Sequence, residues 1–83
     1  MTRNVRMYTL STCSHCKATK RFMDDNNIEY SFSDVDQLHG EERAAVLEEV
    51  KKINPRLSFP TIVIGDHIIV GFKENEIREA LGI

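Results

Sequence analysis

The only two cysteines of this chain lie in the segment Thr12-Cys13-Ser14-His15-Cys16, between two different sequence patterns. Residues 4–10 carry apolar side chains on both faces, as in a strand buried in the middle of a sheet. Residues 14–26 repeat apolar side chains at helical spacing. A Cys-x-x-Cys pair at a strand-to-helix junction is typical of thiol redox chemistry. This short segment therefore constrains both the fold and the chemistry.

The position of each cysteine on the predicted helix indicates how the two thiols differ. The thiolate is the nucleophilic form of cysteine, and the unpaired N–H groups and positive dipole end of a helix N-terminus stabilise it. Cys13 falls where this stabilisation is largest, whereas Cys16 lies one turn further in and is more shielded. Such a pair can attack, hold and release a disulfide without any bound cofactor.

Other uses of a cysteine pair fit the sequence less well. A structural disulfide would close only a tiny loop and would stabilise the fold little. A zinc site needs four ligands at characteristic spacings, and His39 and His67 stand alone and far apart, so we expect no metal site. Two inert core thiols are a further alternative, against which the polar Ser14 and His15 between the cysteines argue.

Length and composition narrow the class of protein. The chain has 83 residues, of which 41% are hydrophobic and 29% charged, so we expect one globular domain over residues 1–83. The net charge of −2 gives no reason to expect nucleic acid or an anionic membrane as a partner. No apolar run has the length of a membrane span, and residues 1–6 lack the apolar stretch of a secretory signal. We therefore expect a monomer in the reducing cytoplasm.

The rest of the pattern predicts a mixed sheet between helices. Residues 28–33 alternate as in a half-exposed strand near a sheet edge, parallel to the first strand. Gly65-Asp66 between two β-branched runs indicates a tight hairpin. The other predicted segments are a polar loop over 34–40, a helix over 41–53, strands over 61–64 and 67–70, and a last helix that ends at Gly82.

With this order of elements, short motifs along the chain resemble the glutaredoxin branch of the thioredoxin-like superfamily. The likeness covers essentially the whole chain. Its motifs, besides the cysteine pair, are Tyr8-Thr9, Phe59-Pro60-Thr61, Ile64-Gly65-Asp66 and Gly71-Phe72. The resemblance implies a thioredoxin-like fold of order βαβαββα, with a four-stranded mixed sheet flanked by three helices.

The resemblance also implies an activity, that of a dithiol–disulfide oxidoreductase with no tightly bound cofactor. By it, Cys13 is the attacking thiol and Cys16 the resolving one, and disulfide-containing proteins are substrates. By the same resemblance, Pro60 is the cis-proline that faces the two cysteines, which leaves the backbone of Phe59 free to pair with a substrate chain. The substrate-binding residues that it implies are Thr12, Phe59, Pro60, Gly71, Phe72 and Lys73.

Two departures from the family pattern concern the electron donor. Many glutaredoxins have a lysine three residues before the first cysteine, which helps to hold a glutathione carboxylate, and this chain has Leu10 there. Many also have Gly-Gly and two acidic residues after the fourth strand, where this chain has Gly71-Phe72-Lys73-Glu74. That run is more similar to the NrdH-redoxins, which thioredoxin reductase reduces. Glutathione and thioredoxin reductase are both candidate donors.

The dipeptide between the cysteines, Ser14-His15, is predicted to tune the redox potential. A histidine beside a thiolate can donate a hydrogen bond or carry positive charge, and both lower the cysteine pKa and make the disulfide more oxidising. The absence of proline at position 14 also leaves room for an iron–sulfur cluster shared between two chains, as in some glutaredoxins. An iron–sulfur or metal carrier that uses the same thiols is therefore the alternative function.

Overall fold

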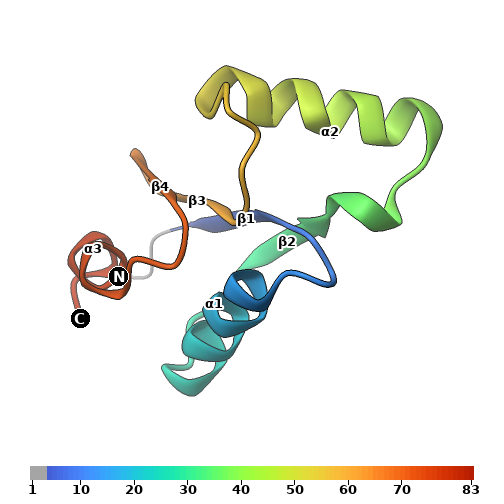
Figure 1. The fold of residues 1–83 in the computed structure, drawn as a ribbon. Coiled ribbons are helices and arrows are strands. Elements are labelled where there is room, and N and C mark those ends of the chain that lie inside the picture. The colour runs from blue at the N-terminus through green and yellow to red at the C-terminus, as the bar shows by residue number, and fades with distance from the viewer. Residues whose placement is uncertain (1–3) are drawn as a thin grey trace.

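One mixed sheet of four strands forms the centre of the computed structural model, which describes residues 4–83 (Figure 1). The strand order is β2-β1-β3-β4, with β1 parallel to β2 and antiparallel to β3, and β3 antiparallel to β4. In chain order the elements are β1 (Val5–Thr9), α1 (Ser14–Asp25), β2 (Ser31–Asp34), the 3-10 helix η1 (Val35–Gln37), α2 (Gly40–Ile53), β3 (Thr61–Ile64), β4 (His67–Val70) and α3 (Glu74–Leu81). The predicted thioredoxin-like fold of order βαβαββα is confirmed.

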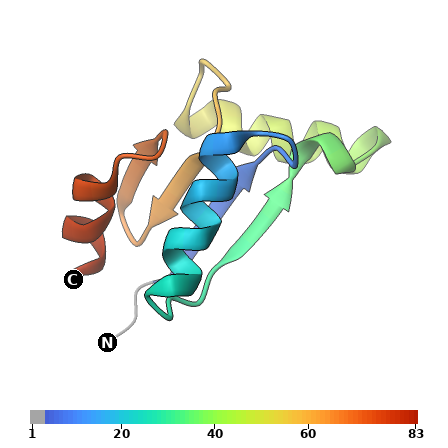
Figure 2. The ribbon, with the colours of Figure 1, turned by 60° about the horizontal axis from the view of Figure 1, so that its bottom comes forward.

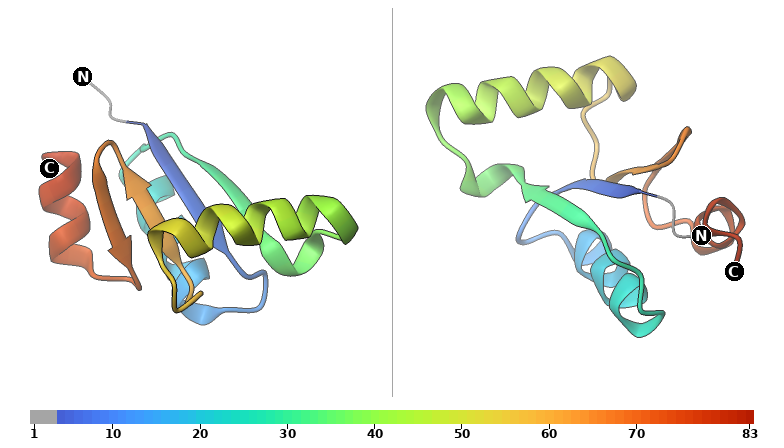
Figure 3. Two further views of the ribbon diagram at one scale, coloured as in Figure 1. Left: turned by 90° about the horizontal axis from the view of Figure 1, so that it is seen from above. Right: turned by 180° about the vertical axis from the view of Figure 1, so that it is seen from behind.

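The helices cover the two faces of the sheet unequally. Helices α1 and α3 lie on one face and α2 lies on the other (Figures 1 and 3). The main apolar cluster fills the space between the sheet and helices α1 and α3, because side chains from the sheet and both helices meet there. Its buried members are Val5, Met7, Phe22, Met23, Ile62, Ile64, Ile69, Ile77 and Ala80.

Strand β1 has the central place that its sequence predicts, since it pairs with a strand on each side. Alternate side chains point to opposite faces of a strand. Val5 and Met7 face the main apolar cluster, whereas the hydroxyl of Tyr8 donates to the Glu49 carboxylate of α2 at 3.3 Å. All three residues are buried. Burial on both faces explains why the segment carries apolar residues without strict alternation.

Strand β2 differs from its prediction. It begins at Ser31 and not at residue 28, and it pairs with β1 from Ser31 opposite Arg6 to Asp34 opposite Thr9. Phe32 is 45% exposed, as befits an edge strand. The predicted polar loop over 34–40 was wrong for Asp34, which ends β2, and for residues 35–37, which form η1 around the buried Val35.

The ends of the other elements agree closely with the sequence. The hairpin strands have the predicted bounds, and the second helix begins one residue earlier than predicted, at Gly40. Gly82 ends α3 with φ 76°, a left-handed conformation, and its N–H bonds to the carbonyls of Arg78 and Glu79. Such a glycine terminates a helix because it has no Cβ to strain that conformation. Across residues 4–83, every helix is too short or too polar to cross a membrane.

Candidate thiol site

The segments that carry the predicted site meet at one end of the sheet. Because Tyr8 pairs with Thr61 and Thr61 pairs with Val70, the residues just beyond these positions lie side by side. They belong to the β1–α1 loop, the α2–β3 connection and the β4–α3 connection, which gather near the start of α1 (Figure 2). The N–H of Gly71 donates to the carbonyl of Pro60 at 2.8 Å, which ties two of these segments together.

Cys13 is the N-cap residue of α1. Its backbone is extended, and its Sγ accepts a hydrogen bond from the N–H of Cys16 at 3.4 Å. Partial burial on its own would raise the pKa of the Cys13 thiol, but hydrogen bonds from the Cys16 thiol and from the N–H groups of Cys16 and His15 outweigh it and lower the pKa. Both N–H groups belong to the first turn of α1, where the sequence argument expects a helix N-terminus to stabilise the thiolate.

Cys16 lies in the opposite environment. Its side chain is completely buried, and the N–H of Leu10 approaches its Sγ at 3.5 Å. Burial, followed by the hydrogen bond that its thiol makes to Cys13, raises the pKa of Cys16 to about 12. Both cysteines are free thiols in this structure. The pair is therefore arranged as a partly exposed thiol with a lowered pKa and, behind it, a buried thiol that stays protonated at neutral pH.

The residues around Cys13 have exposed side chains. Thr12, Ser14 and His15 are all on the surface, within reach of an approaching substrate. The effect of His15 on the Cys13 pKa comes from its backbone N–H. The effect predicted for its imidazole is a separate contribution and stays a prediction.

The loop before β3 carries the predicted substrate-binding residues Phe59 and Pro60. Pro60 is buried and Phe59 is half-buried, and the peptide bond between them is cis, as the sequence resemblance implies. Leu57, two residues earlier, has φ 52° and an exposed side chain. The left-handed conformation is unfavourable for leucine, so contacts elsewhere in the loop must hold it.

Asn54, the residue that follows α2, supplies those contacts, which the sequence analysis did not predict. Its side chain is buried and donates from Nδ2 to the carbonyl and the hydroxyl of Ser58, each at 3.1 Å, and to Oγ1 of Thr61 at 3.0 Å. Its carbonyl accepts from the N–H of Leu57 at 2.9 Å. Asn54-Pro55 directly after a helical pattern is the sequence signal that could have indicated this role, because asparagine side chains often bond to the backbone of a following turn.

A second set of hydrogen bonds that the sequence did not reveal holds the loop before Cys13. The N–H of Ser11 donates to Oδ1 of Asp36 at 2.8 Å, and the Ser11 hydroxyl bonds to the other carboxylate oxygen. The amide of Gln37 donates to the same hydroxyl at 3.1 Å. The Ser11 hydrogen bonds, the side-chain one foremost, lower the pKa of Asp36. The 3-10 helix η1 brings Asp36 to this position, and the sequence had indicated only a polar loop.

The connection after β4 combines a special backbone with inward packing. Gly71 has φ 88°, which favours glycine. The ring of Phe72 packs edge-on against Phe22 with centroids 5.9 Å apart, so it serves the core as well as the surface. Lys73 is exposed and forms an ion pair with Glu76 at 3.7 Å. Of the predicted residues here, Gly71 lies beside Pro60 and Lys73 points into solvent.

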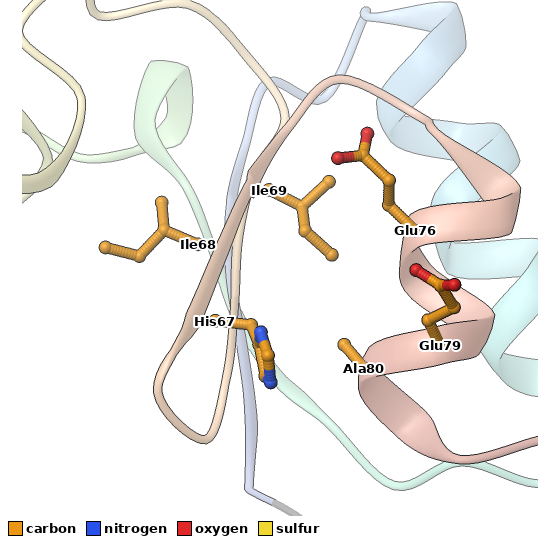
Figure 4. Close-up of a pocket in the computed structure, with 6 residues that line it drawn as sticks. All are labelled: His67, Ile68, Ile69, Glu76, Glu79 and Ala80. Atoms are coloured by element: carbon orange, nitrogen blue, oxygen red, sulfur yellow. The ribbon is translucent and has the colours of Figure 1, made fainter.

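A hollow of about 190 Å³ lies between β4 and α3 and contains neither cysteine. His67 and Ile69 extend from β4 toward α3, and Ile68 extends to the other side (Figure 4). Within the described part of the chain, no group of three or more His, Cys, Asp or Glu side chains could hold a metal ion. The residues that line the hollow are His67, Ile68, Ile69, Glu76, Glu79 and Ala80.

The fold and the paired thiols define a redoxin of the thioredoxin-like superfamily. Within that class, the chain belongs to the glutaredoxin family, whose family model matches residues 5–69. This membership supports a thiol–disulfide oxidoreductase role at the level of the family.

Known relatives agree with this assignment. Methanoredoxin from Methanosarcina acetivorans is 43% identical in sequence to this chain. Its crystal structure matches with a TM-score of 0.92 over 98% of this chain and 86% of that chain. Glutaredoxin from Methanosarcina mazei Go1 is 48% identical, with a TM-score of 0.88 over 98% of this chain and 80% of that one. An uncharacterised glutaredoxin-like 8.6 kDa protein in a rubredoxin operon of Clostridium pasteurianum is 33% identical over 77 residues, which are 93% of this chain and 96% of the relative.

Proposed function

We propose that the protein is a dithiol–disulfide oxidoreductase that reduces disulfides of proteins or small molecules through Cys13. The observation that carries this proposal is the opposite direction of the two thiol pKa values, lowered at Cys13 and raised to about 12 at Cys16. A nucleophile needs its thiolate at working pH. The resolving thiol is better kept protonated until the first step is complete, since two thiolates side by side would repel each other.

The first step is attack by the Cys13 thiolate on one sulfur of a substrate disulfide. The Cys13–substrate bond forms, the substrate S–S bond breaks, and the second substrate sulfur leaves as a thiolate. The N–H of Cys16, 3.4 Å from Sγ of Cys13, holds the attacking sulfur at the exposed end of α1.

The second step is attack by Cys16, as a thiolate, on Sγ of Cys13. The Cys13–Cys16 disulfide forms and the remaining substrate sulfur leaves, so the substrate gains two electrons and the enzyme loses them. The two residues are one helical turn apart, which is the reach that this step needs. An external donor then reduces the enzyme again.

For a protein substrate, the loop of Phe59 and Pro60 provides the docking surface in this proposal. We expect the backbone of Phe59 to pair with an extended substrate segment as an added strand. Asn54 supports this by fixing the loop from inside, and Gly71 supports it by bonding to Pro60. Thr12, exposed beside Cys13, contacts the same segment in this arrangement.

The electron donor is the second part of the proposal. Leu10 stands where many relatives have a lysine for glutathione, and the exposed Lys73 stands among the acidic residues at the start of α3. Both changes reduce the complementarity to glutathione that is typical of the family. NADPH consumption should therefore be measured against a small disulfide with glutathione plus glutathione reductase, and in parallel with thioredoxin reductase.

Each result of that experiment has a clear meaning. Turnover only with thioredoxin reductase makes the protein a redoxin on a glutaredoxin scaffold, and turnover only with glutathione makes it a glutaredoxin in function. Failure in both systems contradicts the proposed activity with these donors and favours the iron–sulfur carrier.

The carrier alternative has its own test. A cluster takes four thiolate ligands, and the chain has two cysteines, one of them completely buried. A second chain or small thiols would have to complete the site, and Cys16 would have to become exposed. Visible absorption of protein purified without oxygen distinguishes the two functions, because a cluster protein is brown and a redoxin is colourless.

A further inference from the structure

The buried position of Cys16 creates a difficulty for the second step. Its thiol must lose a proton before it attacks, yet its side chain is completely buried and burial disfavours the thiolate. Groups inside the protein must therefore offset that cost while the mixed disulfide exists.

Lys20 is the cationic side chain placed to do so. It lies four residues after Cys16 on α1, so the two side chains occupy the same face of the helix. The ammonium is folded against the sheet, with Nζ 2.9 Å from Oδ1 of Asp34 and 4.0 Å from the centroid of the Phe32 ring. The side chains of Lys20 and Asp34 are only 21% and 19% exposed. Lys17, on the same helix, is exposed.

Asp34 binds this ammonium and also the end of β1, directly before the residue whose N–H approaches Cys16. The completely buried hydroxyl of Thr9 donates to Oδ1 of Asp34 at 2.5 Å. The next residue is Leu10, whose N–H approaches Sγ of Cys16 at 3.5 Å. The end of β2 thus connects the lysine to the strand segment that faces the buried sulfur.

The charges around Cys16 change when the mixed disulfide forms. In the reduced protein, burial, the hydrogen bond to Cys13 and repulsion by the Cys13 charge raise the pKa of Cys16, while the N–H of Leu10 and the charge of Lys20 lower it. A Cys13 sulfur in a disulfide carries no charge, so its hydrogen bond with the Cys16 thiol and its charge repulsion no longer raise the pKa of Cys16. Burial then remains opposed by Leu10 and by Lys20, whose charge Asp34 partly offsets.

We infer that Lys20, held by Asp34, is a positioning residue for the second step, in which it favours the Cys16 thiolate that attacks the mixed disulfide. This inference deepens the proposed function and rests on it. The attack on substrate by Cys13 has no need of Lys20.

Reaction of the reduced protein with an excess of Ellman's reagent separates the two steps. Attack by Cys13 releases one thionitrobenzoate and leaves the other bound to Cys13, and attack by Cys16 releases that second one. We expect Lys20→Met to slow the second release at neutral pH by about three- to tenfold, because a smaller fraction of Cys16 is thiolate. Its pH profile should move to higher pH, and the first release should stay unchanged.

Three further variants make the test specific. Lys20→Arg keeps the charge and should restore the second release, and Lys17→Met should behave as the wild type does. Lys20→Gln can still donate to Asp34 without a charge, so it should also slow the second release. If Lys20→Met proves unstable in urea titration, Lys20→Gln still shows whether loss of the charge alone slows the second release.

The outcomes distinguish this inference from the function beneath it. If the wild type releases only the first thionitrobenzoate until excess reagent attacks Cys16 directly, the proposed two-step mechanism fails, and the role of Lys20 with it. If the wild type shows both releases and Lys20→Met and Lys20→Gln keep its second-step pH profile, only the role of Lys20 is overturned.

Discussion

The N–H of Cys16 lies 3.4 Å from Sγ of Cys13 and donates a hydrogen bond to it. In the proposed reaction, Cys16 thus contributes to both steps, since its backbone N–H stabilises the Cys13 thiolate and its side chain is the buried thiol of the second step. The first turn of α1 makes this possible, because the N-cap side chain can accept from the N–H three residues on. The spacing of the two cysteines is therefore also the spacing of a helix cap.

The pH dependence of alkylation should distinguish the two thiols. The pKa of Cys13 lies below its ordinary value of 9.0, so iodoacetamide should modify it increasingly as pH rises, with a midpoint below 9.0. Cys16, with a pKa of about 12 and no exposure, should react only after unfolding. Mass spectrometry of the alkylated peptides assigns each site. Faster labelling of Cys16 than of Cys13 in the folded protein would contradict the assigned roles.

Replacement of either cysteine by serine should give two different failures. Cys13→Ser should lose all disulfide reductase activity, because the only exposed nucleophile of the pair is gone. Cys16→Ser should still attack but should accumulate the mixed disulfide with a protein substrate, which non-reducing electrophoresis detects. Normal turnover of protein disulfides by Cys16→Ser, with nothing trapped, would show that Cys16 is not the resolving thiol.

His15→Ala separates the imidazole from the backbone at that position. The backbone N–H of His15 contributes to the lowered pKa of Cys13 and remains in the variant. Because the side chain is exposed, we expect the thiol titration of Cys13 to shift little. A rise in the Cys13 pKa would instead support the role that the sequence suggested for the imidazole, and the disulfide would then become harder to reduce. His39→Ala, which removes an exposed histidine outside the thiol site, is the matched control.

Local patterns were enough to predict most of the fold. The hairpin bounds depend on two β-branched runs and the Gly65-Asp66 turn, and the position of Cys13 depends on where α1 begins, so neighbouring residues determine both. The start of β2 was wrong because its length depends on pairing with β1, a partner far away in the sequence.

The supporting contacts of the site were missed for the same physical reason. Asp36 contacts Ser11 across 25 positions of sequence, and Lys20 reaches Asp34 across 14. Periodicity shows which face of an element is apolar, but it does not show which polar side chains meet when elements pack. The cysteine pair could be found because its partners are within one helical turn.

Asn54→Ala should destabilise the protein and impair the loop of Phe59 and Pro60. The variant removes the donor to Oγ1 of Thr61 and one of the two donors to the carbonyl of Ser58, which keeps its bond from the Thr61 hydroxyl. The loss of a buried hydrogen-bonding group predicts a decrease in the free energy of unfolding of about 1–3 kcal/mol, measured by urea titration. Reduction of a protein disulfide should fall more than reduction of a small one. Asn75→Ala, on the exposed side of α3, is the control, and equal effects from both variants would refute the role of Asn54.

Asp36→Ala should loosen the loop before Cys13, and pH should reveal its effect. The carboxylate accepts from the N–H and hydroxyl of Ser11, and these bonds lower its pKa below the ordinary 3.8. A carboxyl with a lowered folded-state pKa contributes stability above its unfolded value, and that stability is lost as pH falls through the folded value. The difference in unfolding free energy between wild type and variant should therefore be constant near neutral pH and shrink below about pH 3.8.

The same variant should also slow attack by Cys13 about two- to tenfold at neutral pH, because a displaced nucleophile aligns poorly with its target. Asp25→Ala, at the exposed end of α1, is the matched control for a lost carboxylate. A stability difference that persists undiminished at acid pH would mean that Asp36 acts through packing and not through its charge. An unchanged attack rate would mean that the hydrogen bonds between Asp36 and Ser11 do not position Cys13.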